Sequence, residues 1–315
     1  MSAELASLDA TATLRLVTVT PGMCGPTTLL AGRVGDWTWE TVSQLCGIDV
    51  LRARLPTGEP TYLAFTYLHL ASTPSLWPAA LAFGDRLEVV SRPFDFGSES
   101  VLTVHRLRRL DGEEGAPRLL AAEEPYLAPL DGCLYVESFN RWVCRSRPES
   151  NEDLVRASPA GFRHRHLPSL PEPFSPRLVC QRARRLSTFR PREAADEPLG
   201  PGEVCWQVEL DPSRDLNAVG LVYFAAYFAL LDGALLRFYR RLGRSDAAFL
   251  RRVVLDQKLC YLGNAEGDAA LTLTVRGRRA AGRPPREVFD VVFADRERTV
   301  ALATVEIASG GEHGA

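Results

Sequence analysis

Two short stretches carry residue types that could stabilise negative charge on an oxygen atom. The first contains Gly32, Gly35 and Asp36, and the second contains Asn217 and Gly220. Each stretch precedes a segment with helical spacing, and the free N–H groups at a helix start favour a polarised or anionic oxygen. We therefore predict that these five residues bind the carbonyl or enolate oxygen of a substrate. The alternative is that the glycines only allow the chain to turn.

Aromatic and imidazole side chains provide further candidates. Trp37 and Trp39 follow the first stretch and could form apolar walls that keep water from a bound carboxylate. They could equally fill space around the expected helix. His69 and His105 fall in expected strands, where we favour solvated or hydrogen-bonded histidines over catalytic ones. Of the four, Trp37 is predicted to bind substrate.

The signatures of several enzyme classes are missing from the sequence. It contains no G-x-S-x-G, H-E-x-x-H or G-x-G-x-x-G motif, so hydrolase triads, zinc sites and dinucleotide binding have little support. Among 37 basic side chains only Lys258 is a lysine, which excludes a phosphate loop of the Walker type. The seven cysteines are widely spaced and form no C-x-x-C pair. We expect neither a metal nor a bound cofactor.

The first half of the chain is expected to place one helix among several strands. Residues 36–47 should form the helix, with Asp36 as its cap, Trp39, Val42 and Cys46 on one face, and Gly47 at its end. Runs of β-branched and aromatic residues predict strands at 13–20, 62–70, 85–91, 100–106 and 133–139.

The second half repeats this plan. Residues 204–210 read as a strand, and a long helix is expected at 223–241. Further strands are expected at 253–262, 270–276, 288–294 and 300–308. The helix is apolar nearly all round over residues 223–231, so it must be covered on most sides. We predict an α+β fold, a double hotdog in which each unit is a central helix wrapped by a curved antiparallel sheet. The units are 1–145 and 177–315, with a linker at 146–176.

Bulk composition limits the partners and the location. The net charge is −2, with 46% hydrophobic and 24% charged residues, as in an ordinary globular protein. Such a charge gives no global attraction for nucleic acid. The first ten residues lack the basic start and apolar run of a leader, and no apolar stretch is long enough to span a membrane. We expect a cytoplasmic protein that binds neither nucleic acid nor membrane.

Five segments distributed along the chain resemble the LnmK family of polyketide biosynthesis. They are MCGPTTL at 23–29, GDWTWE at 35–40, GEPTYLAF at 58–65, SFNRW at 138–142 and SNEDL at 150–154. The resemblance implies a double-hotdog acyltransferase and decarboxylase. Such an enzyme converts methylmalonyl-CoA to a propionyl group on the phosphopantetheine thiol of an acyl carrier protein. It also implies that Tyr62 is the catalytic acyl acceptor, although no general base can be carried over.

A phenol is a demanding nucleophile, because it is almost wholly protonated at neutral pH. Nearby positive charge would have to activate it. The alternative is that Tyr62 only hydrogen-bonds the substrate and that the carrier thiol attacks directly.

Arginines in the second half of the chain are further candidate binding residues. Arg278 and Arg279 lie in an arginine-rich stretch and are predicted to contact CoA phosphates or an acidic carrier protein, with solvated hairpin tips as the alternative.

Residues 215–222 resemble the thioesterase pattern D-x-N-x-x-G-H-V, but Leu221 replaces its histidine. A hotdog thioesterase and a non-catalytic acyl-thioester binding module therefore stay open as alternatives.

Overall fold

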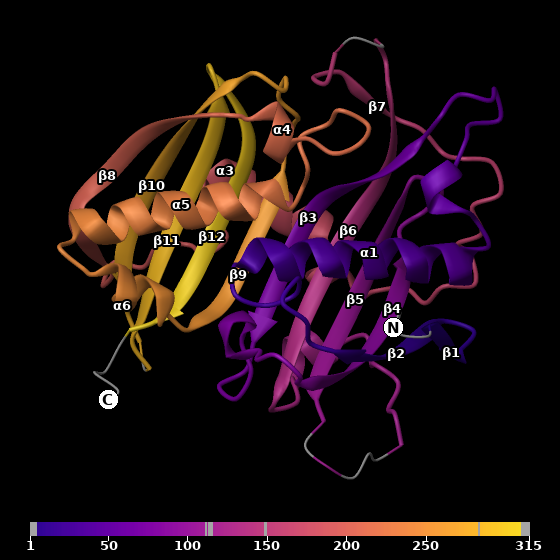
Figure 1. Cartoon of the computed structure of the whole chain (residues 1–315), viewed down its shortest axis with the longest axis horizontal. Helices are drawn as coiled ribbons and strands as arrows, with labels where there is room; N and C mark the ends of the chain where they lie inside the picture. The colour runs from indigo at the N-terminus through magenta and orange to yellow at the C-terminus, as the bar shows by residue number, and fades with distance from the viewer. Residues whose placement is uncertain (1–4, 111, 113–115, 148–149, 283, 310–315) are drawn as a thin grey trace. The chain divides into compact units, whose positions relative to one another are not determined.

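The computed structural model describes residues 5–110, 112, 116–147, 150–282 and 284–309 (Figure 1). The chain divides into two compact units, Met1–Leu178 and Val179–Ala315, here the first and the second unit. Residues 146–176, predicted as a linker, belong to the first unit and include a short strand that pairs with its sheet.

The first unit is an antiparallel sheet with one long helix across it (Figure 1). The sheet order is β1-β2-β4-β5-β6-β3, and β7 pairs with β6. Its elements are β1 (Leu5–Asp9), β2 (Ala12–Thr18), α1 (Thr27–Cys46), η1 (Val50–Arg52), β3 (Tyr62–Ser72), η2 (Pro78–Ala80), β4 (Arg86–Asp95), β5 (Ser100–Arg109), α2 (Glu124–Leu127), β6 (Cys133–Arg145), β7 (Leu154–Arg156) and η3 (Glu172–Phe174).

Helix α1 begins earlier than its sequence pattern indicates. It follows Pro26 and starts at Thr27, so the predicted start at Asp36 is wrong. Packing of one face against the sheet outweighs the roughly 1 kcal/mol that an interior glycine costs a helix. The predicted end is correct, because Gly47 takes the left-handed conformation, with φ of 63°.

The core between α1 and the sheet contains large apolar side chains from both. Val42 and Cys46 of α1 pack with Leu63 of β3, Val101 of β5 and Trp142 of β6. Burial raises the pKa of the Cys46 thiol to about 12, so this cysteine is a core residue rather than a nucleophile.

The second unit repeats the arrangement with a sheet of order β9-β12-β11-β10-β8. Its central helix is buried on most sides, as its apolar sequence predicts. The elements are α3 (Pro176–Leu186, which spans the boundary between the units), β8 (Glu197–Glu209), α4 (Pro212–Asp215), α5 (Ala226–Arg241), α6 (Asp246–Leu250), β9 (Val254–Tyr261), β10 (Ala270–Ala280), β11 (Arg286–Asp295) and β12 (Arg298–Ala308).

Each unit therefore has a helix lying against an antiparallel sheet, which confirms the predicted α+β, double-hotdog architecture. The ten predicted strands all exist, with ends that differ by up to seven residues. Helix α5 begins at Ala226 rather than 223. In the described part of the chain, no helix has the length and apolar character required to cross a membrane.

Candidate active site

Tyr62 is the first residue of β3 and is half-buried. Its ring meets Trp39 of α1 edge to face, with 5.7 Å between the ring centroids. The Trp39 ring also lies 5.6 Å from that of Phe65. The indole N–H of Trp39 donates a hydrogen bond of 3.0 Å to the carbonyl oxygen of Leu63, which fixes the ring beside β3. Tyr62 thus stands at one end of an aromatic wall.

The phenol of Tyr62 is far from the start of α1. Trp39 lies twelve residues after Thr27 in this helix, which at 1.5 Å per residue is about 18 Å along the axis. Tyr62 therefore does not lie beside the free amides at the start of this helix. The C-terminal half of α1 is the part that approaches Tyr62.

Gly32, Gly35 and Asp36 lie in the interior of α1, not at its start. Their amides belong to the helical i to i−4 hydrogen-bond ladder, so they cannot serve as free donors to an enolate. The Asp36 side chain is 49% exposed and lies 3.8 Å from Arg33. The prediction that these three residues form an oxyanion pocket is wrong, because the helix extends nine residues further towards the N-terminus than predicted.

Trp37 is buried inside the unit, with 1% of its surface exposed. The guanidinium of Arg15 lies over its ring at 5.8 Å, and Arg15 is itself paired with Glu40 at 2.6 Å. Trp37 is therefore a core residue, and its buried indole N–H has no hydrogen-bond partner among the described residues. Substrate binding by Trp37 stays a prediction. Trp39, which the site prediction omitted, is the tryptophan that contacts Tyr62.

His105 of β5 lies in a fully hydrogen-bonded chain beneath α1. The Thr38 hydroxyl donates to the Val34 carbonyl oxygen at 2.9 Å, so its oxygen accepts from Nε2–H of His105 at 2.8 Å. Nδ1 of His105 then accepts from the Ser91 hydroxyl at 2.7 Å. Burial, with a smaller effect of Arg15, lowers the pKa of His105 to about 3. This histidine is neutral and structural, as its strand position suggested.

His69 is also held in a pair. Its Nδ1 lies 2.6 Å from Glu137, whose second oxygen accepts a hydrogen bond of 2.8 Å from the Tyr126 hydroxyl. Burial and the Glu137 charge raise the pKa of Tyr126, so Tyr126 stays a protonated donor.

Asn140 of β6 lies on the face of the sheet that packs against α1. It is directly opposite Phe65 of β3 and Val101 of β5. Trp142 and Val101 pack against α1 in the core, and alternation along β6 puts Asn140 on the same side as Trp142. The Asn140 side chain is thus directed towards the helix, opposite the Phe65 ring that contacts Trp39.

The Asn140 side chain is 0% exposed. Among the described residues, neither its oxygen nor its nitrogen has a hydrogen-bond partner. Ser138 and Thr103 are directly opposite each other on β6 and β5, and their buried hydroxyls also have no partner within the described chain. Buried groups left unpaired cost about 1–3 kcal/mol each. A substrate carbonyl or carboxylate could supply the missing hydrogen bonds.

Asn217 and Gly220 form a closed loop before α5. The Asn217 side-chain oxygen accepts from the N–H groups of Val219 and Leu221 at 3.1 and 3.0 Å. The Gly220 N–H donates to the Asn217 carbonyl oxygen at 2.9 Å, and Gly220 has φ of 75°. Gly220 is therefore the turning glycine of the alternative reading, and its amide is not the predicted donor. Substrate binding by Asn217 stays a prediction.

Arg278 is a buried structural residue. Its side chain is 5% exposed and forms ion pairs with Asp196 at 3.0 Å and with Asp290. It also donates to the Arg190 carbonyl oxygen at 2.7 Å. The predicted contact with CoA or a carrier protein is wrong for Arg278, because three segments distant in sequence enclose its guanidinium. Arg279 is 52% exposed, 3.3 Å from Glu197, and its docking role stays a prediction.

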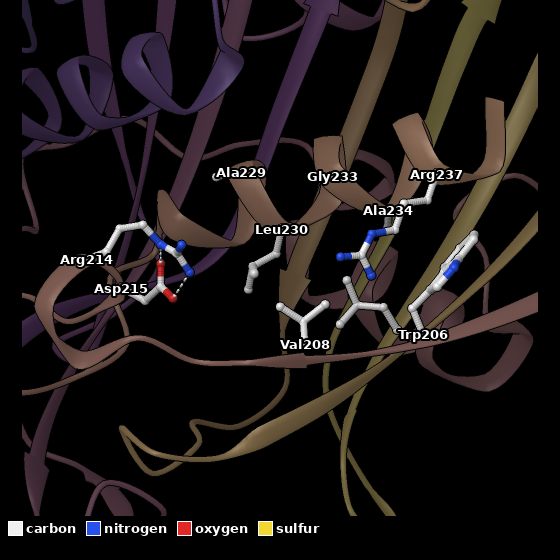
Figure 2. Close-up of a pocket in the computed structure, with 10 residues that line it drawn as sticks. Trp206, Val208, Arg214, Asp215, Ala229, Leu230, Gly233, Ala234 and Arg237 are labelled. Atoms are coloured by element: carbon white, nitrogen blue, oxygen red, sulfur yellow. Dashed lines mark hydrogen bonds and ion pairs between the residues drawn. The ribbon is translucent and has the colours of Figure 1, made fainter. Parts of the chain in front are cut away.

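The second unit contains a cavity of about 270 Å³ between α5 and strands β8 and β10. Figure 2 shows Arg237 extending from α5 beside Trp206, and Arg214 paired with Asp215. This pair has oxygen–nitrogen distances of 2.7 and 2.8 Å. The two charges of this pair neutralise each other, and the Arg237 guanidinium lies beside apolar walls that include Val208 and Leu230.

Metal ligation has no support in the described residues, where no group of three or more His, Cys, Asp or Glu side chains has suitable geometry. The site chemistry of the first unit instead combines a phenol, aromatic walls and buried neutral donors.

These features define a double-hotdog protein with polar side chains buried between helix and sheet. The family model described as LnmK N-terminal Hot Dog Fold domain matches residues 14–191, more than half of the chain. The chain belongs to this family, as its sequence motifs predicted.

Solved structures with the same fold include several thioesterases by name. A protein described as an oleoyl thioesterase from Lactobacillus plantarum has a TM-score of 0.60 and 11% identity, covering 99% of this chain and 98% of its own. An acyl-ACP thioesterase from Bacteroides thetaiotaomicron has a TM-score of 0.55 and 10% identity, covering 94% and 97%. The 12:0-ACP thioesterase from Umbellularia californica has a TM-score of 0.53 and 11% identity, covering 94% and 93%. At these identities the similarity shows the fold alone. No curated protein matches the sequence.

Proposed function

We propose that this protein is an acyl-thioester acyltransferase and decarboxylase. It converts methylmalonyl-CoA to a propionyl group and loads that group on the phosphopantetheine thiol of an acyl carrier protein in polyketide biosynthesis. Membership of the LnmK hot dog family supports this proposal, and so does the thioesterase character of proteins with the same fold. The observation that carries it is the unpartnered Asn140 amide, buried opposite Phe65 in the aromatic wall that ends at Tyr62.

The proposed decarboxylation uses binding and electrostatics. The bond between Cα and the carboxylate breaks, CO₂ leaves, and the electron pair passes into the thioester as an enolate. The Asn140 side-chain N–H donates to the enolate oxygen, with the Ser138 and Thr103 hydroxyls as further donors on the same face. The aromatic walls Trp39 and Phe65 exclude water around the departing carboxylate. A proton from solvent then adds at Cα after CO₂ has left and gives a propionyl thioester.

The proposed transfer step involves Tyr62. In one form the phenol oxygen attacks the thioester carbonyl, CoA leaves as the thiol, and the carrier thiol later takes the propionyl group from the tyrosine ester. In the other form Tyr62 donates a hydrogen bond to the carbonyl oxygen while the carrier thiol attacks directly. Both forms use a phenol beside Trp39, and the ring contact between Trp39 and Tyr62 supports them.

The test is intact-mass analysis of the protein and a phosphopantetheinylated carrier protein after mixing with methylmalonyl-CoA. A propionyl adduct on the carrier, together with release of CO₂, is the expected result. A methylmalonyl adduct on the carrier without release of CO₂ would indicate an acyltransferase that has no decarboxylase activity. Free acid with free CoA would indicate a thioesterase. An unchanged substrate would indicate a binding module, and each of these three outcomes would refute the proposal.

A further inference from the structure

Three arginines surround a hollow of about 360 Å³ in the first unit. They are Arg141 of β6, Arg156 of β7 and Arg177 at the start of α3, and the β4–β5 turn at residues 96–99 completes the lining. The lining contains one acidic side chain, Glu99, so its formal charge is positive. The oxygen of Glu99 lies 3.8 Å from the Arg156 guanidinium, and both side chains are more than 40% exposed.

Arg177 is held in a fixed orientation. It donates a hydrogen bond of 2.8 Å to the Phe96 carbonyl oxygen. Its guanidinium also lies over the rings of Phe96 and Phe139, at 5.3 and 5.7 Å from their centroids. Those two rings pack edge to face at 5.0 Å. A guanidinium held in this way loses little side-chain freedom when it binds an anion.

The hollow borders the Tyr62 end of β3, on the face of the sheet away from Asn140, because Arg141 and Asn140 are neighbours on β6 and point to opposite faces. Arg141 is opposite Ala64 of β3, and Tyr62 is opposite Val143, two residues beyond Arg141 on β6. Diagonal neighbours of this kind are roughly 7–8 Å apart on one face of a sheet. An anion held by Arg141 would therefore lie within a short span of Tyr62.

We infer that this hollow binds the phosphate group at the end of a pantetheine arm. The inference rests on the proposed function, because both of its thioester substrates carry that arm. Guanidinium groups suit phosphate through paired, charge-assisted hydrogen bonds. Two sources share the chemistry: the pyrophosphate of CoA and the phosphodiester of a phosphopantetheinylated carrier protein.

The test compares binding of CoA, 4′-phosphopantetheine and pantetheine to the full-length protein by titration calorimetry. The double variant Arg156→Gln with Arg177→Gln should weaken CoA and phosphopantetheine by roughly ten- to hundredfold, as expected for lost charge-assisted hydrogen bonds. Pantetheine, which has no phosphate, should bind both proteins alike. Weakening of both phosphate ligands assigns the hollow to the phosphate that they share. Weakening of CoA alone would place the nucleotide end of CoA in the hollow and would overturn the inference.

Two further variants test whether the charge of the lining and its location in the hollow determine CoA affinity. Glu99→Gln removes the acidic group from the lining and should tighten CoA binding severalfold, a change of opposite sign. Arg52→Gln is the matched control, because Arg52 is an exposed arginine 3.9 Å from a carboxylate outside the hollow. It should leave CoA affinity unchanged.

Failure of the inference differs from failure of the proposed function. Equal CoA affinity for the wild type and the double variant, with both folded by thermal melting, would overturn the hollow as a phosphate site and leave the proposed function standing. Absence of CoA binding to the wild-type protein would overturn both.

Discussion

Replacing Asn140 by leucine should stabilise the protein while it impairs the reaction. The side chain is fully buried, both its polar atoms have no partner among the described residues, and the residues directly opposite are Phe65 and Val101. Leucine is similar in size and needs no hydrogen bond. Removing an unsatisfied amide should raise the free energy of unfolding by about 1–3 kcal/mol. At about 2–4 °C per kcal/mol, the melting temperature should rise by roughly 2–12 °C.

Activity should change in the opposite direction. Loss of one donor to a developing oxyanion typically costs about 10²–10³ in rate, so propionyl transfer by the variant Asn140→Leu should fall by that factor. The assays are thermal melting and urea titration for stability, and timed intact-mass analysis of the carrier protein for transfer.

Thr38→Val is the matched control, since Thr38 lies in the same layer between α1 and the sheet but is fully hydrogen-bonded. It should lower stability by about 1–2 kcal/mol. A lower melting temperature for Asn140→Leu would show that Asn140 is a structural residue. Unchanged transfer by this variant would refute its role as a donor.

Three further predictions concern other residues. Tyr62→Phe removes only the hydroxyl, so propionyl transfer should fall at least tenfold with little change in melting temperature; full transfer, measured by intact mass, would exclude a catalytic phenol. Arg278→Gln should cost about 3–5 kcal/mol of unfolding free energy by urea titration, because it leaves buried carboxylates without their ion-pair partner. The control Arg279→Gln should cost less than about 1 kcal/mol. Similar losses in the two variants would contradict the buried ion-pair network. The pKa of His105 is about 3 in the folded state against about 6.5 unfolded. The neutral His105 therefore keeps its full contribution to stability above pH 6.5, and this contribution is lost as the pH falls towards 3. At pH 5 the loss is roughly 2 kcal/mol of unfolding free energy. In His105→Asn this loss between pH 7 and pH 5 should disappear, as measured by urea titration at the two pH values.

In the tertiary structure the candidate site residues lie in the middle of strands rather than at helix starts. Sequence reasoning concentrated on helix starts, where glycines suggested free amides. The buried polar groups that we propose for the site lie instead on interior strands, at Asn140, Ser138 and Thr103, whose side chains have no partner among the described residues. Asn140 and Ser138 lie in the SFNRW segment that supported the family resemblance, and this is the one sequence signal that marked two of them.

The sequence by itself determined the architecture. Apolar residues all round residues 223–231 require a wrapped helix, and β-branched runs specify the strands, because both signals arise from neighbours along the chain. The family motifs also follow directly from residue order. Local periodicity did not determine where α1 begins, since its glycines favour a loop in isolation and only packing against the sheet makes them helical.

Only the tertiary structure decided which polar side chains are satisfied. Arg278 and Arg279 are adjacent in sequence, yet one is enclosed by Asp196 and Asp290 and the other faces solvent. Arg141, Arg156 and Arg177 come from separate elements and meet around one hollow. Within the described part of the chain the Asn140 side chain has no hydrogen-bond partner, because strand pairing sets apolar residues opposite it. Burial and pairing depend on register between segments far apart in the chain, and no local pattern encodes that register.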